Sequence, residues 1–282
     1  MSSPLRTAAR PRERLADLRG YRALVESFLH RQLRTRFLGS RIGWLWSLVN
    51  PLAMLAAYWL VFGVILGADR GMPPSAHGLH LFAVYLFTGL VAWNTFTSVL
   101  TRTIDGLVEL MPLRRKVAFP VLAPLLGSAM ATVVERSVEV SLLVVVYVAI
   151  GNIGPTVLLL PILVVLTGCL GLGFGLLLSV ANVKYRDIGH LIGVALQLYF
   201  YATPVIYPPA FVDQRFPEGH ALRPFLVDNP LAQLVGAYRD VLWDLTVPSP
   251  GRWLALLGWT VGALAVGWWY FRDRAYLIGE ES

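Results

Sequence analysis

The sequence contains long runs without a single acidic or basic side chain. No Asp, Glu, Lys or Arg occurs in 42–68, 71–101, 140–183, 188–212 or 253–271. A helix needs about 20 apolar residues to cross a bilayer core about 30 Å thick. Runs of this length are typical of membrane-spanning helices, and they restrict the fold class to an all-α integral membrane protein.

The composition agrees with a surface that faces lipid. Charged residues make up 15% of the chain, whereas a soluble domain carries roughly 25%. Residues 1–20 are rich in Arg and lack the apolar core of a signal peptide, so we expect no cleaved leader. The single cysteine, Cys169, excludes a disulfide within the chain.

Six membrane-spanning helices are predicted, and the basic residues orient them. We place the spans near 43–67, 79–101, 121–150, 155–181, 188–207 and 252–271. Of the 24 Lys and Arg residues, 18 then lie in segments on one side, which are 1–42, 102–119, 182–187 and 272–282. By the positive-inside rule this side is the cytoplasm, so both termini are predicted to be cytoplasmic. Topology therefore explains the net charge of +7, and we expect no nucleic-acid partner.

An amphipathic helix is predicted before the first span. In 21–42, apolar residues recur at helical spacing, beginning with Tyr21, Leu24, Val25 and Phe28. Such a helix could lie at the membrane interface with its arginines among the lipid headgroups. Alternatively, it could dock a cytoplasmic partner, and the sequence favours neither reading. The chain thus divides into a cytoplasmic segment (1–42), a transmembrane domain (43–271) and a cytoplasmic tail (272–282).

Four strings, in order along the chain, resemble the membrane subunit of ATP-binding-cassette exporters of polysaccharides. They are RTRFLGSRIGWLWSLVNPLAM (34–54), LMPLRRKVAFP (110–120), NVKYRDIGHLIGVALQLYFYATPVIYP (182–208) and DNPLAQLVGAYRDVLW (228–243). The resemblance to this family, which exports O-antigen, capsule, teichoic acid and galactan, implies a permease in a bacterial inner or plasma membrane. It implies that a lipid-linked polysaccharide moves from the cytoplasmic to the outer side.

The resemblance also implies a homodimer bound to two copies of a separate ATPase subunit. The chain has no G-x-x-x-x-G-K-[ST] phosphate loop, so ATP and Mg are expected on the partner. Gly171, Gly173 and Gly175 lie in an apolar run without a preceding strand, which favours close helix packing over nucleotide binding. We expect no catalytic residue, metal or cofactor on this chain.

The loop 102–119 and the turn 182–187 are the candidate contacts with the ATPase. Both mix charges with apolar residues on the side predicted to be cytoplasmic, although a solvated basic loop would show the same pattern. The candidate coupling residues are Glu109, Arg114, Arg115, Lys116, Phe119, Lys184, Arg186 and Asp187.

Aromatic and amide side chains recur along single faces of the first, second and fifth predicted spans. Aromatic faces pack against the C–H faces of sugars, so such residues could line a channel for a glycan. Taken singly, each is equally typical of a membrane interface or a lipid-facing position. The candidate channel residues are Trp44, Tyr58, Phe62, Tyr85, Phe96, Gln197, Phe200 and Tyr201.

Three charged residues lie inside the third predicted span. Glu135, Arg136 and Glu139 are spaced so that Arg136 can pair with Glu139 along a helix. A charged side chain near the bilayer centre costs free energy unless it is paired or hydrated. We favour a structural or gating pair over a hydrophilic wall or a proton relay.

Residues 208–251 are predicted to form re-entrant or interfacial helices on the outer side. Seven prolines divide the segment, and 231–243 has a helical apolar period. Phe225, Tyr238 and Trp243 are the candidate gate residues, and a plain interfacial anchor is the alternative.

Other functions stay open at this point. An ATP-driven exporter of a small lipid or drug shares the layout. A membrane glycosyltransferase or polymerase would need a catalytic constellation, which the acids of 208–251 do not form recognisably. A proton-coupled carrier rests only on the three charges of the third span.

Overall fold

The computed structural model describes residues 11–35, 46–68, 73–114, 116, 119–185, 187–217 and 220–274, and all regular structure within these ranges is helical. The elements are α1 (Pro11–Thr35), α2 (Trp46–Tyr58), the π-helix η2 (Trp59–Ile65), α3 (Phe82–Arg114), α4 (Leu122–Ala149), the 3-10 helix η4 (Pro155–Leu159), α5 (Leu160–Lys184), α6 (Ile188–Ala202), α7 (Pro209–Arg215), α8 (Arg223–Val227), α9 (Pro230–Leu242) and α10 (Pro250–Arg274).

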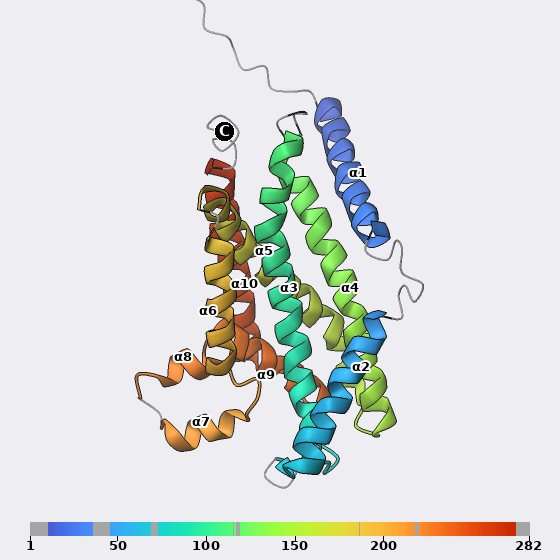
Figure 1. Cartoon of the computed structure of the whole chain (residues 1–282), viewed down its shortest axis with the longest axis vertical. Coiled ribbons are helices and arrows are strands. Elements are labelled where there is room, and N and C mark those ends of the chain that lie inside the picture. The colour runs from blue at the N-terminus through green and yellow to red at the C-terminus, as the bar shows by residue number, and fades with distance from the viewer. Residues whose placement is uncertain are drawn as a thin grey trace, which may run out of the picture.

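Helix α3 stands at the centre of the bundle. It packs against α4, α5 and α9, while α5 also packs against α10 (Figure 1). Leu107 of α3 shares one apolar cluster with Leu125 of α4, Val180 of α5 and Phe271 of α10. The end of α3, the start of α4 and the ends of α5 and α10 therefore meet at one end of the bundle. We call it the Arg114 end, and the opposite one the Phe82 end.

Membrane crossing is supported by length and composition. Within the described residues, four helical stretches are long and apolar enough to span a bilayer, namely Leu48–Ile65, Phe82–Arg114, Pro155–Lys184 and Pro250–Arg274. Helix α4 is 28 residues long but carries the three charges, and α6 is apolar but has only 15 residues. The structure thus shows an all-helical, multi-pass membrane protein, and the count of six spans stays a prediction.

The helices differ sharply in how well they are packed. In the apolar stretch of α3, 83% of the residues are buried, whereas in Leu48–Ile65 only 6% are. Helix α6 has no buried residue. The surfaces of α2, η2 and α6 are apolar and uncovered within the chain, so lipid or another protein must cover them.

Small residues bring α5 close to its neighbours. A Cβ atom added at Gly267 of α10 would lie 2.2 Å from the Gly173 carbonyl oxygen. One added at Gly175 would lie 2.5 Å from the Thr103 Cβ atom. These distances are too short for any larger residue, so the predicted packing role of the α5 glycines is confirmed.

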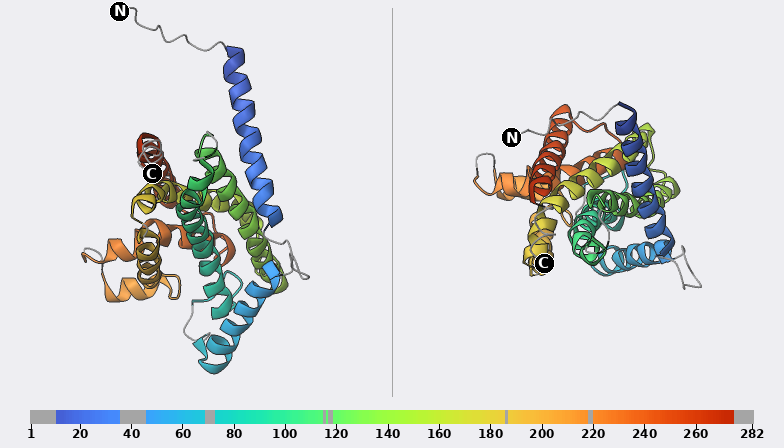
Figure 2. Two further views of the ribbon diagram at one scale, coloured as in Figure 1. Left: turned by 45° about the horizontal axis from the view of Figure 1, so that its top comes forward. Right: turned by 90° about the horizontal axis from the view of Figure 1, so that it is seen from above.

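Helix α1 lies along α4, as both views of Figure 2 show. A Cβ atom at Gly127 would meet the Val25 carbonyl oxygen at 2.7 Å, so the glycine lets the two backbones approach. Within 20–34 of α1, the half-buried apolar residues are those of the predicted apolar face, and the polar Gln32 is half-buried beside them. The apolar ones are Tyr21, Leu24, Val25, Phe28, Leu29 and Leu33.

The segment 208–251 forms three helices at the Phe82 end. The Asn229 side chain caps α9 by accepting a hydrogen bond from the Ala232 N–H at 2.8 Å, and Pro230 occupies the first turn. Helix α9 is buried against α3, α5 and α10. Helices α7 and α8 pack on each other away from the bundle, and Arg223 pairs with Asp213 at 3.0 Å (Figure 1).

Candidate functional site

A groove of about 440 Å³ lies between α1 and the last turns of α3. Apolar side chains and both signs of charge line it together. Its lining residues are Phe28, Arg31, Gln32, Glu109, Leu110, Pro112, Leu113 and Lys116. A surface of this kind suits an amphipathic element of another protein, because apolar contacts supply affinity and charges fix orientation.

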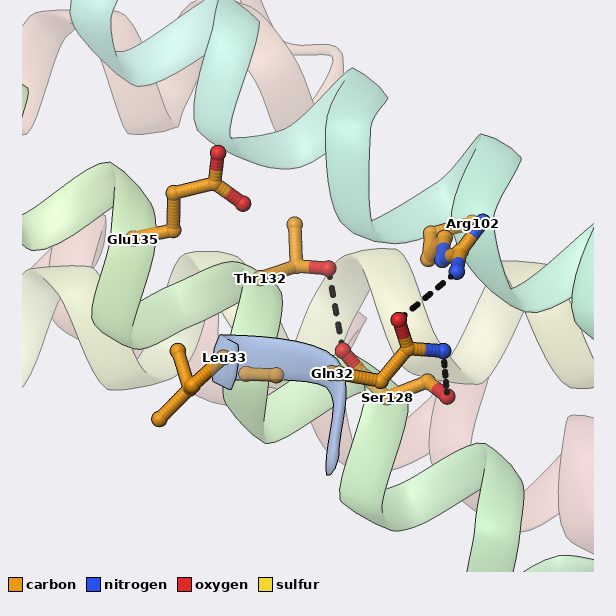
Figure 3. A pocket seen from close by; sticks show the side chains of 7 residues that line it. Gln32, Leu33, Arg102, Ser128, Thr132 and Glu135 are labelled. Carbon is orange, nitrogen blue, oxygen red and sulfur yellow. Dashed lines mark hydrogen bonds between the residues drawn. The ribbon is translucent and has the colours of Figure 1, made fainter. Parts of the chain in front are cut away.

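A polar network holds the walls of this groove together. Arg102 of α3 donates to Gln32 Oε1 of α1 at 3.0 Å and pairs with Glu109 Oε1 at 3.3 Å. Gln32 in turn donates to the Ser128 hydroxyl of α4 at 3.3 Å (Figure 3). Because Gln32 bonds both Arg102 of α3 and Ser128 of α4, a displacement of α1 must disturb both other helices.

A small polar pocket continues this network along α4. Its volume is about 30 Å³, which is the space of a single water molecule. Gln32, Arg102 and Ser128 line it together with Thr132 and Glu135 (Figure 3). Ser128, Thr132, Glu135 and Glu139 follow at four-, three- and four-residue steps, so they form one polar stripe on α4.

The predicted coupling residues separate into two places. Glu109 and Lys116 line the groove, Arg114 ends α3, and Phe119 is half-buried shortly beyond it. Lys184 and Asp187 are exposed at the turn between α5 and α6, where the Lys184 ammonium lies 5.4 Å from the Tyr185 ring centroid. Arg115 and Arg186 lie outside the described residues. The turn contributes nothing to the groove lining.

Sequence reasoning missed the α1 contribution to the groove. Phe28, Arg31 and Gln32 are about 80 residues from the α3 residues that they face. The amphipathic pattern of α1 was the available signal, but it did not reveal which helix would cover the apolar face. The groove is formed by α1 and the end of α3, which were two separate candidates in the sequence analysis.

The predicted channel residues also fall into separate groups. On α2 and η2, Tyr58 lies 6.4 Å from Phe62, and Phe62 lies 4.9 Å from Phe82 of α3 between ring centroids. On α6, Phe200 lies 5.2 Å from Trp93 of α3, which the sequence had not suggested. Gln197 and Tyr201 are exposed on the same helix. Trp44 lies outside the described residues.

Two other channel candidates are enclosed by the bundle. Phe96 is buried, with its ring centroid 6.3 Å from that of Phe174 on α5. Tyr85 is buried with its ring 5.4 Å from Trp243 and beneath the guanidinium group of Arg239. Among the described residues, the aromatic side chains of α3 are buried, whereas Trp59 of η2, Tyr201 of α6 and Trp268 of α10 are exposed.

The intramembrane charges are partly paired. Arg136 donates to Glu139 Oε2 at 3.0 Å, and the side chains are 27% and 8% exposed, respectively. The Glu139 charge also acts on the Tyr58 hydroxyl of α2. Glu135 lines the small polar pocket instead. The predicted pairing along the helix is therefore present, and it faces the weakly packed α2.

The three predicted gate residues do not gather in one place. Phe225 is exposed on α8, whereas Tyr238 and Trp243 are fully buried at α9. The Tyr238 hydroxyl shares a hydrogen bond of 3.2 Å with the Thr167 hydroxyl of α5. Tyr238 and Trp243 thus belong to the packed core, and Phe225 is the exposed member of the set.

These features define a multi-pass membrane protein with a groove of mixed apolar and charged lining between α1 and α3. The profile of the membrane-spanning "ABC-2 type transporter" family matches residues 23–226, and the chain belongs to that family.

Similar proteins are named for the export of glycans. The chain is 27% identical over 260 residues to the O-antigen export system permease protein RfbA of Myxococcus xanthus, covering 92% of this chain and 95% of that one. It is 24% identical over 227 residues to the RfbA permease of Klebsiella pneumoniae, covering 79% and 82%. It is 24% identical over 261 residues to the polysialic acid transport protein KpsM of Escherichia coli, covering 89% and 93%.

Proposed function

We propose that this chain is the membrane subunit of an ATP-driven exporter of a lipid-linked polysaccharide. The observation that carries the proposal is full-length similarity, because the chain belongs to a transporter family and aligns over about nine-tenths of its length with O-antigen and polysialic acid permeases.

The groove between α1 and α3 is the proposed seat of a separate ATPase subunit, which binds ATP and Mg. Its apolar lining residues, among them Phe28 and Leu113, would bury an apolar face of the partner. The cations Arg31 and Lys116 and the anion Glu109 in its lining would set the orientation of the partner. Movement of the partner would reach the bundle through Arg102, because that side chain bonds both α1 and Glu109.

A second copy of the chain is the proposed cover for the exposed faces of α2, η2 and α6. These faces are apolar and contribute almost no buried residues to the single chain. Their aromatic residues, among them Tyr58, Phe62 and Tyr201, would then face a path between the two copies. Sugar rings could slide along such aromatic faces without a tight binding site.

The proposed orientation places the Arg114 end of the bundle in the cytoplasm of a bacterium. Among the described residues, Arg114, Lys116, Lys184 and Arg272 belong to this end together with the groove, and cytoplasmic loops of membrane proteins are enriched in Lys and Arg. Both termini would be cytoplasmic, and the glycan would leave at the Phe82 end.

Purification from native membranes in mild detergent tests the proposal. We expect a stoichiometric ATPase subunit to accompany the chain and to hydrolyse ATP. The groove variant Glu109→Lys/Lys116→Glu should lose this partner while still inserting into the membrane. The control variant Arg272→Glu reverses an exposed charge outside the groove and should retain it. Equal retention of the ATPase by both variants would remove the groove from the proposal.

Export itself is measured in a strain whose surface glycan depends on this chain. Loss of the chain should leave the lipid-linked polysaccharide in the cytoplasmic leaflet, and the wild-type chain should restore it to the surface. Unchanged surface glycan in the absence of the chain would refute polysaccharide export.

A further inference from the structure

Helix α6 ends abruptly inside the packed part of the molecule. It stops at Ala202, and Thr203 has an extended backbone. Pro204 and Pro208 prevent the helix from continuing. The carbonyl groups that follow the helix therefore lack helical partners. Val205 is 0% exposed, so its carbonyl group cannot rely on solvent.

A buried arginine from α9 supplies the missing partners. Arg239 is 3% exposed. It donates one hydrogen bond to the Pro204 carbonyl oxygen at 2.6 Å and another to the Val205 carbonyl oxygen at 2.5 Å. The planar guanidinium fork suits two neighbouring oxygen atoms, which a lysine ammonium would not bridge in the same way.

The rest of the surroundings of Arg239 is aromatic. The guanidinium carbon lies 3.7 Å from the centroid of the Tyr85 ring, and Trp243 meets that ring edge-on. Gly89 of α3 leaves the necessary room, because a Cβ atom there would lie 3.0 Å from Arg239 Nη2 and 3.2 Å from the Val205 carbonyl oxygen. The segment 203–205 is thus held between α3 and α9 by one cation.

This cation has no ion-pair partner among the described residues. The two carbonyl groups that accept its hydrogen bonds both belong to the segment that follows α6, while Tyr85 and the Asp244 carboxylate also interact with its charge. Among the described residues, its own Nε atom, Thr203 Oγ1 in the segment that it holds and Trp243 Nε1 are buried without a hydrogen-bond partner. Incompletely satisfied buried polar groups are unusual and mark places where a second arrangement can compete.

We propose that Arg239 is a positioning residue that latches the end of α6 to α3 and α9, and that release of this latch frees α6 to move at the Phe82 end. Displacement of segment 203–205 breaks both hydrogen bonds to Arg239 together. The segment therefore has two states, bonded and released, rather than a continuous range of positions. If the proposed transport function holds, the latch keeps the glycan path closed at its exit until ATP-driven movement reaches α6.

A buried reporter cysteine tests the latch without any assay of transport. The native cysteine is removed by Cys169→Ala, and Val205→Cys is introduced into the purified chain in lipid nanodiscs. Reaction with a water-soluble maleimide should be slow, because position 205 is buried. Arg239→Gln should accelerate it about tenfold or more, as expected when hydrogen bonds to a charged group are lost. Arg239→Lys should give an intermediate rate.

Two controls separate the latch from general destabilisation. Arg252→Gln removes a neighbouring arginine that pairs with Asp240 and leaves segment 203–205 untouched, so it should not change the labelling rate. A cysteine at Ala123, buried at the Arg114 end, should stay unreactive in the Arg239→Gln background. Unchanged labelling at position 205, or equal acceleration at positions 205 and 123, would overturn the proposal.

A milder variant covers the case in which Arg239→Gln does not fold. Gly89→Ala presses on both the guanidinium group and the Val205 carbonyl group, so it should accelerate labelling at position 205 in the same direction. No acceleration in a folded Gly89→Ala chain would also contradict the latch. Failure of glycan export in every variant, the wild type included, would refute the proposed function while labelling still decides the latch.

Discussion

The contact between α1 and α4 predicts a selective effect of Gly127→Val. A Cβ atom at position 127 lies 2.7 Å from the Val25 carbonyl oxygen and 2.9 Å from the Phe28 Cβ atom. The first distance is about 0.7 Å short of ordinary van der Waals contact, which begins at 3.4 Å. Because the neighbouring atoms belong to backbone, α1 itself must retreat from α4.

The size of the effect follows from this retreat. A radial gap of 0.5–1 Å forfeits roughly a quarter to a half of the dispersion energy of the contacting atoms. Overpacking typically costs about 1–3 kcal/mol. At about 1.4 kcal/mol for each factor of ten, the docking equilibrium of α1 should weaken between about fivefold and 150-fold.

Hydrogen exchange measured by mass spectrometry is the suitable assay. Peptides from α1 should exchange faster by this factor in Gly127→Val, because most of the stability of a helix in a protein comes from tertiary packing, while peptides from α5 should keep their protection. Gly262→Val is the matched control, since nothing lies within 4 Å of that Cβ position in α10. Equal protection of α1 in both variants would refute the packing argument. Loss of the ATPase subunit from Gly127→Val alone would further connect α1 docking to coupling.

Two further perturbations test the charges of the molecule. Partial desolvation and the neighbouring Asp240 raise the pKa of Asp244, which lies in the loop between α9 and α10, from its ordinary 3.8 to about 6. The folded chain therefore holds this proton more tightly than the unfolded chain, so stability should fall as pH rises from about 4 to about 6. Asp244→Asn should flatten the melting temperature across this window and raise it at neutral pH, and an unchanged pH profile would contradict the assignment. Removal of the Arg136 charge by Arg136→Met should lower the melting temperature because it leaves Glu139 unpaired, whereas Arg136→Met/Glu139→Met should recover most of the loss. A double variant as unstable as the single one would show that the pair is not the cause.

Much of the fold follows from patterns along the sequence. The apolar runs predicted the long helices, and the spacing of Leu24, Val25 and Phe28 predicted the face of α1 that now lies half-buried. Gly171, Gly173 and Gly175 predicted close packing, which the short distances from α5 to Thr103 and Gly267 bear out. These predictions succeed because helical periodicity and side-chain size are local properties.

Assembly of the sites depends on contacts that local patterns do not specify. The sequence analysis assigned no role to Arg239, yet the residue is buried where it donates to the two carbonyl groups after α6 and lies over the ring of Tyr85. Tyr85 was a candidate channel residue because of its helical spacing, but Arg239 of α9 covers its ring. Only the placement of α9 against α3 distinguishes these roles, and no periodicity within either helix encodes that placement.

The distribution of packing indicates which helices can move. Helix α3 is buried over most of its length and spans the distance from Glu109, at the groove, to Tyr85, beneath Arg239. At 1.5 Å per residue these positions are about 36 Å apart along a continuous helix. A well-packed helix of this kind transmits displacement as a rigid rod rather than bending. Helices α2 and α6 are almost unburied, so small shifts of α3 and α4 meet little resistance from them. Force applied at the groove should therefore appear as movement of α2 and α6, and under the proposed latch the two hydrogen bonds of Arg239 must break before α6 can follow.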